Sequence, residues 1–316
     1  MEISFIIALY HIEITENLGK GDKLDNVTFI SNDASVSKGL IPTDAIDVIG
    51  QLEYNGLLSA KAFVYSSEKL PDNMTPESYL VDRLYFVQSF LSAIWLKMDN
   101  NIDFELGFAF YKKDGGIGVS SNYLALAYTN AHVESKNAIL NREKLREIRT
   151  LHRDKVIYIK NSHKDRKETQ LLKKYSRFEM TLYHIQAARA ESDIGLKISN
   201  YCSALEALFS TSQAELAHQL SERLAYCISK SPEERLVNYK KSKQAYTIRS
   251  KVVHGTYIKE NNLPQVKDIA SFCDTSLRMV MSNLLMNDQL YKSFSSGNEV
   301  LDEYMLNLIF GIIETK

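Results

Sequence analysis

The spacing of apolar residues changes near residue 141, and this change limits the folds open to the chain. Before that point apolar and polar residues alternate, as at Ile3, Phe5, Ile7 and Leu9, which is typical of strands with one buried face. After it apolar residues recur three or four positions apart, as on one face of an α-helix. The sequence therefore predicts an α+β N-terminal domain followed by an all-α antiparallel helical bundle.

The N-terminal part contains one strong helix signal. Thr75 can cap a helix, Pro76 suits the first helical position, and apolar residues continue with helical spacing to Met98. Alternating residues predict strands near 3–9, 12–14, 27–30, 104–110 and 123–126. The last two strands are expected to be joined around Gly115, Gly116 and Gly118, and Pro42, Thr43 and Asp44 are expected to open a short helical segment.

Helical spacing dominates the rest of the chain. It predicts helices at about 138–152, 167–191, 194–210, 213–229, 233–254, 264–287 and 298–312, with one short strand possible at 156–159. The loops between these helices are short, which favours antiparallel packing of neighbours.

Charge is distributed unevenly along the 316 residues. Residues 1–141 carry 10 Lys and Arg against 18 Asp and Glu, residues 142–164 carry 8 against 3, and residues 165–316 carry 20 against 18. Such a shift in composition marks a domain boundary. We therefore expect an acidic α+β domain at 1–141, a basic connecting segment at 142–164 and a helical bundle at 165–316.

Several protein classes are not expected from the sequence. The sequence has no run of 18 apolar residues, so it predicts no transmembrane helix. Its apolar start lacks the basic flank of a signal peptide. The three cysteines form no Cys-x-x-Cys motif, which argues against a disulfide framework or a zinc cage. The histidines show no metal-ligand spacing. We expect a cytoplasmic protein with no metal and no cofactor.

One motif remains as a candidate for chemistry, with Arg249 and His254 five positions apart at the end of a predicted helix. Arginine can hold a phosphate by two parallel hydrogen bonds, and histidine can move a proton near neutral pH. Gly255 directly after the histidine is expected to end the helix. Arg146 with His152 and Arg177 with His184 have similar spacing, so spacing alone does not identify the site.

The surroundings favour Arg249 and His254 over the other two pairs. From residue 235 to residue 259 the chain has seven basic residues and no acidic one, a field that attracts a polyanion. Tyrosines interleaved with them can stack on bases. The residues expected to bind RNA are Lys240, Lys241, Lys243, Tyr246, Lys251 and Tyr257, and Tyr239 and Arg235 belong to the same run.

Three segments in this order resemble the HEPN superfamily, specifically its Apea-like branch. They are Ser203–Phe209 (SALEALF), Leu220–Ala225 (LSERLA) and Arg249–Gly255, and the resemblance covers about residues 165–290. It implies a bundle that forms a homodimer in which two Arg-x4-His motifs share a cleft. It further implies a metal-independent endoribonuclease, often a toxin or phage-defence effector, acting on RNA such as tRNA.

Carried onto this sequence, the resemblance makes Arg249 the phosphate ligand and His254 the general acid or base. Ser250 stands where family members often have Asn, Asp or His directly after the arginine. We interpret Glu206 and Arg223, on largely apolar predicted helices, as an ion pair that supports the bundle. A direct catalytic role for this pair is the less favoured alternative.

Two other hypotheses stay open at this stage. In the first, the bundle is a non-catalytic HEPN module that serves for dimerisation, RNA binding or ligand binding. In the second, the acidic N-terminal domain covers the basic cleft until a trigger releases it. One substitution separates the first hypothesis from an endoribonuclease. His254→Ala would abolish cleavage by an endoribonuclease, whereas it would leave binding by a non-catalytic module intact.

Overall fold

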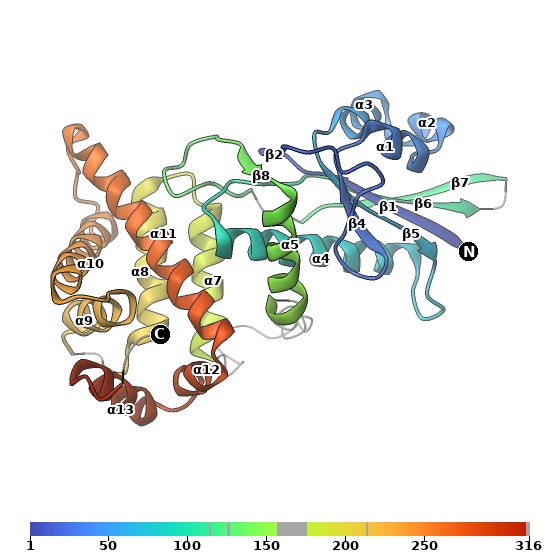
Figure 1. Cartoon of the computed structure of the whole chain (residues 1–316). Coiled ribbons are helices and arrows are strands. Elements are labelled where there is room, and N and C mark those ends of the chain that lie inside the picture. Colours follow the sequence, from blue (N-terminus) through green and yellow to red (C-terminus); the bar gives the residue numbers. More distant parts are fainter. Residues whose placement is uncertain (114, 125–126, 157–175, 213, 314–316) are drawn as a thin grey trace. The chain divides into compact units, whose positions relative to one another are not determined.

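A computed structural model describes residues 1–113, 115–124, 127–156, 176–212 and 214–313. The chain forms two compact units (Figure 1). The first comprises residues 1–128 and 135–164, and the second comprises residues 129–134 and 165–316. The basic segment expected as a connection at 142–164 is thus grouped with the first unit, and six residues before position 141 are grouped with the second.

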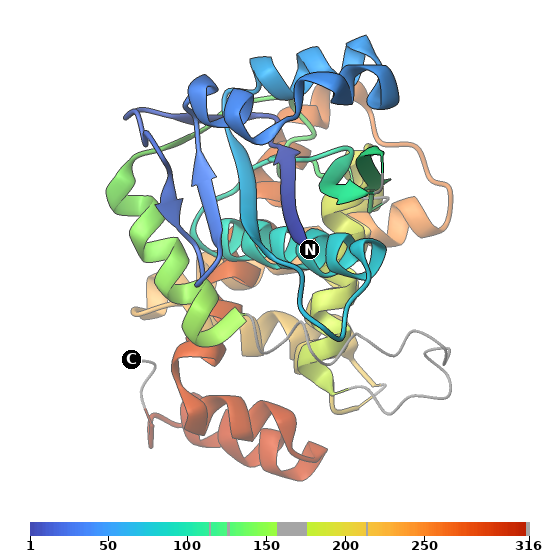
Figure 2. The same cartoon turned by 90° about the vertical axis from the view of Figure 1, so that its right-hand side faces the viewer.

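A six-stranded antiparallel sheet with strand order β3-β4-β5-β1-β6-β7 forms the centre of the first unit. Figure 2 shows strands of this sheet, in shades of blue, side by side. A separate two-stranded parallel pair joins β2 to β8. The strands are β1 (Glu2–Ala8), β2 (Ile12–Ile14), β3 (Asp22–Lys23), β4 (Thr28–Ser31), β5 (Phe63–Lys69), β6 (Gly107–Lys113), β7 (Gly116–Asn122) and β8 (Ala138–Leu140).

Helices cover both faces of this sheet, and the central strand β1 therefore buries side chains on both sides. Ile6 and Ala8 belong to the core shared with α1 (Ala34–Leu40), α2 (Ile46–Ile49) and α3 (Gln51–Ser59). Phe5 and Ile7 point the other way, toward α4 (Pro76–Lys97), since a Cβ on Gly107 would meet both of them and Leu84. Alternate residues of β1 thus contribute to two hydrophobic cores, one on each face of the sheet.

The predicted long helix is confirmed at its start. The Thr75 side chain accepts a hydrogen bond from the Ser78 N–H at 3.3 Å, and Pro76 is the first helical residue. The short helical segment predicted after Pro42 is also present, as a 3-10 turn at Thr43–Ala45 that leads into α2.

Two predicted elements have different bounds in the structure. Of the strand expected at 123–126, residues 125 and 126 lie outside the described residues, and the strand that pairs with β6 ends at Asn122, as β7. Gly118, expected in the connection, lies inside β7, where a Cβ would meet the Tyr111 ring of β6 at 2.1 Å. The helix expected from 138 begins at α5 (Arg142–Leu151), where the Asn141 side chain accepts from the Lys144 N–H at 2.9 Å. Residues 138–140 instead form β8, which pairs with β2. In both strands the two outer residues are buried and the middle one is exposed, as the two-residue period of a strand requires.

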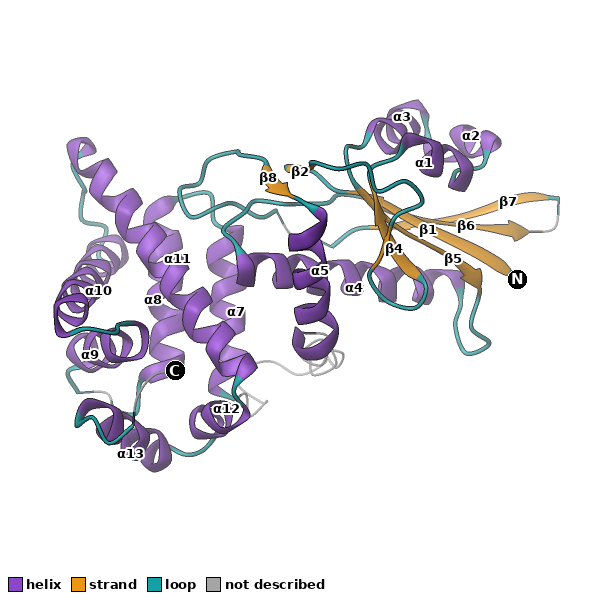
Figure 3. Cartoon of the chain, viewed as in Figure 1, coloured by secondary structure: helices purple, strands orange, loops and turns teal. Residues whose placement is uncertain are grey.

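The described part of the second unit is helical, and the orange strands in Figure 3 all lie in the first unit. An α+β part followed by a helical part is therefore confirmed. The helices are α7 (Arg177–Ala190), α8 (Ile194–Phe209), α9 (Leu216–Ile228), α10 (Pro232–Val253), α11 (Leu263–Met286), α12 (Asp288–Ser295) and α13 (Asn298–Ile309). Helix α12 was not predicted.

Helix α8 is central to this unit, since it packs against α7, α9, α10 and α11. Its buried residues include Ile198, Cys202, Leu205 and Phe209, spaced three or four apart. The described helices include none that is both long and apolar enough to span a bilayer. Most of the predicted strand at 156–159 and the start of the predicted helix at 167–191 lie outside the described residues.

Candidate functional site

Helix α10 is the element that positions the predicted motif. At its start the Ser231 side chain accepts from the Glu234 N–H at 3.2 Å, and Pro232 occupies the first helical position. At its end Gly255 has φ +64° and donates to the Val252 carbonyl at 3.1 Å. The next N–H reaches back to Lys251 at 2.7 Å, which completes a Schellman motif. The prediction that Gly255 ends the helix at His254 is confirmed.

Cationic side chains follow one exposed face of α10. Lys240, Lys243, Thr247, Lys251 and His254 are spaced three or four residues apart, so they share a face, and all five are exposed. We call these five residues the α10 stripe. The structure thus places three of the predicted RNA-binding lysines and the predicted catalytic histidine in one row.

Arg249 lies on the opposite, inward side of α10. Its guanidinium forms an ion pair with Glu206 of α8, with Nη1 3.3 Å from Oε1 and Nη2 donating to Oε2 at 3.3 Å. Nη1 also donates to the Tyr246 hydroxyl at 3.2 Å, and the guanidinium lies over the Tyr246 ring at 5.1 Å. The Arg249 and Glu206 side chains are 27% and 20% exposed, so the cluster is largely shielded from water.

The structure therefore does not bring Arg249 and His254 into contact within one chain. Five helical steps rotate one side chain by about 140° relative to the other. Within the described residues, no hydrogen bond or ion pair joins Arg249 to His254. Ser250 is exposed beside the stripe.

The predicted ion pair between Glu206 and Arg223 is wrong. Glu206 pairs with Arg249, whereas Arg223 on α9 donates to the Phe209 carbonyl at 2.7 Å and pairs with Asp302 of α13. The reason is that Arg223 faces the end of α8, where a carbonyl lacks a helical partner. Both charged residues do support the helical unit, but through other partners.

Burial shifts the pKa of groups around Glu206. It raises the pKa of the Cys202 thiol to about 12, and together with the Glu206 carboxylate it raises the pKa of Tyr246. It also lowers the pKa of His184 on α7, against an opposing effect of the Glu206 carboxylate. The sequence analysis considered His184 only as a partner of Arg177 in a motif with similar spacing. The signal that could have indicated a position near Glu206 is the helical spacing of the residues around His184.

The other two Arg-His pairs have structural roles. Arg177 donates to the Ser210 carbonyl at 2.5 Å, beyond the end of α8. His152 is buried, shares a 2.7 Å hydrogen bond with Ser89 and meets Phe86 edge-on. Arg249 also has partners within the helical unit, so contacts of this kind do not by themselves single out one of the three pairs.

Not all of the predicted basic run is available to a ligand. Lys241 pairs with Asp268 of α11 at 3.0 Å, and the Arg235 guanidinium lies over the Tyr226 ring at 4.5 Å. Tyr257 is 77% exposed beyond the end of α10. Within the described residues, the lysines of this run whose ammonium groups form no ion pair or hydrogen bond are Lys240, Lys243 and Lys251, on the α10 stripe, and Lys259, beyond the end of the helix.

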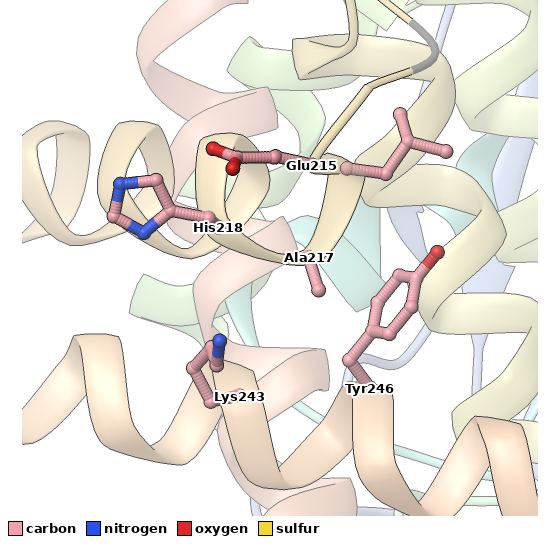
Figure 4. A pocket seen from close by; sticks show the side chains of 6 residues that line it. Glu215, Ala217, His218, Lys243 and Tyr246 are labelled. Atoms are coloured by element: carbon pink, nitrogen blue, oxygen red, sulfur yellow. The ribbon is translucent and has the colours of Figure 1, made fainter.

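An open pocket of about 640 Å³ lies beside the stripe, between the start of α9 and the middle of α10 (Figure 4). Lys243 and Tyr246 rise into it from α10, and the wall opposite comes from α9. The Tyr239 hydroxyl and His218 Nδ1 are 2.8 Å apart and hold the histidine at its rim. The lining residues are Glu215, Leu216, Ala217, His218, Lys243 and Tyr246.

No group of three or more His, Cys, Asp or Glu side chains with metal-binding geometry occurs among the residues that the structure describes. Comparison of the chain with protein-family models, curated proteins and solved structures finds no match. The geometry of α10 and its neighbours is therefore the basis for a functional assignment.

Proposed function

We propose that the helical unit binds RNA along α10 and cleaves it as a metal-independent endoribonuclease of the HEPN type. The observation that carries this proposal is the α10 stripe, in which three exposed lysines and an exposed histidine form one row. Lysines spaced along a helix face suit the repeated charge of a phosphate backbone. A histidine in the same row lies where it can exchange a proton with a bound nucleotide.

In the proposed reaction the ribose 2′-oxygen attacks the adjacent phosphorus, and the bond from phosphorus to the 5′-oxygen breaks. A neutral imidazole takes the 2′-hydroxyl proton, and an imidazolium gives a proton to the leaving 5′-oxygen. The products are a 2′,3′-cyclic phosphate and a 5′-hydroxyl. Arg249 would bind the pentavalent phosphate, which would then replace the Glu206 carboxylate as its partner.

A homodimer supplies the second imidazole that this reaction uses. One chain offers a single histidine on the stripe, and a symmetric pair of α10 helices would offer two. Val253 and Tyr257, on either side of His254, are exposed apolar side chains that suit such a contact. Measuring the molar mass of the protein in solution tests this part of the proposal directly.

The proposed activity is tested by incubating the purified protein with total RNA and with tRNA in EDTA. We expect cleavage products that end in a 2′,3′-cyclic phosphate. His254→Ala and Arg249→Ala should each reduce the rate by about 10²-fold or more, whereas His11→Ala, in the first unit, should not. Cleavage that the chelator abolishes, or that survives His254→Ala, would contradict the proposal.

A cytoplasmic toxin or phage-defence effector is the cellular role that we propose for such an activity. Expression of the wild-type chain should then slow growth, and His254→Ala should relieve the effect at equal protein level. Normal growth at high expression of an RNA-cleaving protein would contradict a role as a toxin.

One observation favours a second candidate, a non-catalytic RNA-binding module. The Arg249 guanidinium already has Glu206 and Tyr246 as partners, as expected for a structural residue. Under this alternative the stripe binds RNA and His254→Ala leaves binding unchanged. Binding of RNA with no cleavage by the wild-type dimer would favour it over the endoribonuclease.

A further inference from the structure

The pocket between α9 and α10 shares Lys243 with the α10 stripe and Tyr246 with the Arg249 cluster. We infer that this pocket takes one nucleotide of the bound RNA and selects guanine. The inference rests on the proposed RNA binding and adds base selection to it. It does not depend on cleavage.

The Tyr246 ring can act as the stacking surface of this pocket. The ring is held in place from one side, since the Arg249 guanidinium lies over it and donates to its hydroxyl at 3.2 Å. Leu216 and Ala217 of α9 add apolar lining. A fixed aromatic ring beside apolar side chains suits the flat face of a nucleobase.

Lys243 connects the pocket with the path of the RNA backbone. It lies between Lys240 and Thr247 on the stripe and also lines the pocket. In the described part of the chain its ammonium forms no ion pair or hydrogen bond with another residue. A phosphate bound there would place the attached nucleotide at the entrance of the pocket.

Glu215 supplies the basis for selecting one base. Glu215 lines the pocket, and its carboxylate points toward His218 (Figure 4). That carboxylate does not cap α9 and has no hydrogen-bond or ion-pair partner among the described residues. The pairing edge of guanine presents two parallel N–H donors, which a carboxylate accepts together. Adenine and cytosine present one amine, and uracil presents a single N–H between two carbonyl oxygens that a carboxylate repels. The expected order is therefore guanine, then adenine and cytosine, then uracil.

The inference is tested by measuring equilibrium binding to short fluorescent 2′-O-methyl RNA. This RNA cannot be cleaved by attack of its 2′-oxygen, so the measurement is independent of catalysis. The probes are an oligouridine and three copies in which the central base is guanine, adenine or cytosine. We expect the guanine probe to bind about tenfold more tightly than the oligouridine.

Variants of the pocket separate selection from general affinity. Glu215→Gln should remove most of the guanine preference, whereas Glu260→Gln, an equal charge change at an exposed residue outside the pocket, should retain it. Tyr246→Leu should weaken binding of every probe by about tenfold, and Tyr246→Phe, which keeps the ring, should weaken it less. Circular dichroism of each variant shows whether the helical unit is folded.

Each result has a defined meaning. Equal affinity for the four probes, or a guanine preference that survives Glu215→Gln, would overturn base selection while leaving RNA binding intact. Failure of the wild-type protein to bind any probe would overturn this inference and the proposed function together. Displacement of the guanine probe by polyglutamate at equal charge concentration would identify a site for anions in general and would also overturn the inference.

Discussion

The position of Arg249 on α10 places its guanidinium beside Glu206. Its side chain faces α8, where Glu206 and the Tyr246 hydroxyl accept its hydrogen bonds. His254, five residues on, faces water. The two residues of one sequence motif therefore have different surroundings, and a bound phosphate has to compete with a carboxylate for the guanidinium.

Removing the carboxylate of this cluster should lower stability. We expect Glu206→Gln to reduce the free energy of unfolding by about 1–2 kcal/mol, because Arg249 loses its counter-charge in a largely shielded place. Urea denaturation measures this. The control Asp268→Asn removes the partner of Lys241, where the carboxylate is 58% exposed, and should change stability by less than about 0.5 kcal/mol. Equal effects of the two substitutions would contradict the account.

Two buried thiols should make stability fall at alkaline pH. Burial raises the pKa of Cys202 to about 12 and that of Cys273 well above its ordinary value near 9. Above pH 9 the unfolded chain loses these protons while the folded chain keeps them, so the free energy of unfolding decreases as pH rises from 9 toward 12. Urea midpoints at several pH values measure the slope, and Cys273→Ala should reduce it. A slope unchanged by that substitution would exclude the thiol as a cause.

At the scale of single elements, α10 combines a stripe that faces water with a side that packs on α8, α9 and α11. The Schellman motif at its end fixes where the stripe stops and places His254 at the last position. The place of His254 in the stripe thus depends on the conformation of Gly255.

Gly255→Ala should lower the free energy of unfolding by about 1 kcal/mol, since φ is +64° and an alanine there is strained. No atom lies within 4 Å of the added Cβ, so the cost comes from the backbone alone. Gly297→Ala is the matched control, because its Cβ also meets nothing and its φ is −63°. Thermal unfolding compares the two, and equal midpoints would contradict the argument.

Local signals in the sequence predicted several elements and missed others for physical reasons. The cap at Thr75, the glycine at 255 and the helical spacing from α8 to α11 act within a few residues and were readable. Strand β5 was missed because its apolar and polar residues do not alternate, since Phe63 and Val64 are adjacent and both buried and the strand ends in polar residues. The pairing of Arg249 with Glu206 was missed because the two residues are 43 positions apart and only packing of α10 on α8 brings them together.

At the scale of the whole chain, each of the two units is made of two separate stretches of the sequence. Residues 129–134 belong to the helical unit, where the Thr129 N–H donates to the Arg189 carbonyl at 2.7 Å and His132 Nε2 lies 2.6 Å from Ser271 Oγ. A boundary drawn from charge at residue 141 separates this segment from its partners. The charge of the sequence therefore does not show that residues 129–134 group with the helices.

His132→Ala should destabilise the helical unit by about 1 kcal/mol by removing the bond to Ser271. The single tryptophan, Trp95, is buried on α4 and reports on the first unit. We expect the far-ultraviolet circular dichroism transition to shift to lower urea while the tryptophan fluorescence transition stays in place. A shift confined to the fluorescence would show that the segment stabilises the first unit instead.

The account depends most on the α10 stripe, and one binding measurement tests it most directly. The affinity for uncleavable RNA is compared between the wild-type chain and the triple variant Lys240→Gln, Lys243→Gln and Lys251→Gln, across a range of salt concentrations. The account predicts weaker binding and a slope of log affinity against log salt that is smaller by about 2, or about 0.7 for each lost phosphate contact. An unchanged affinity and slope would show that RNA does not bind along this helix.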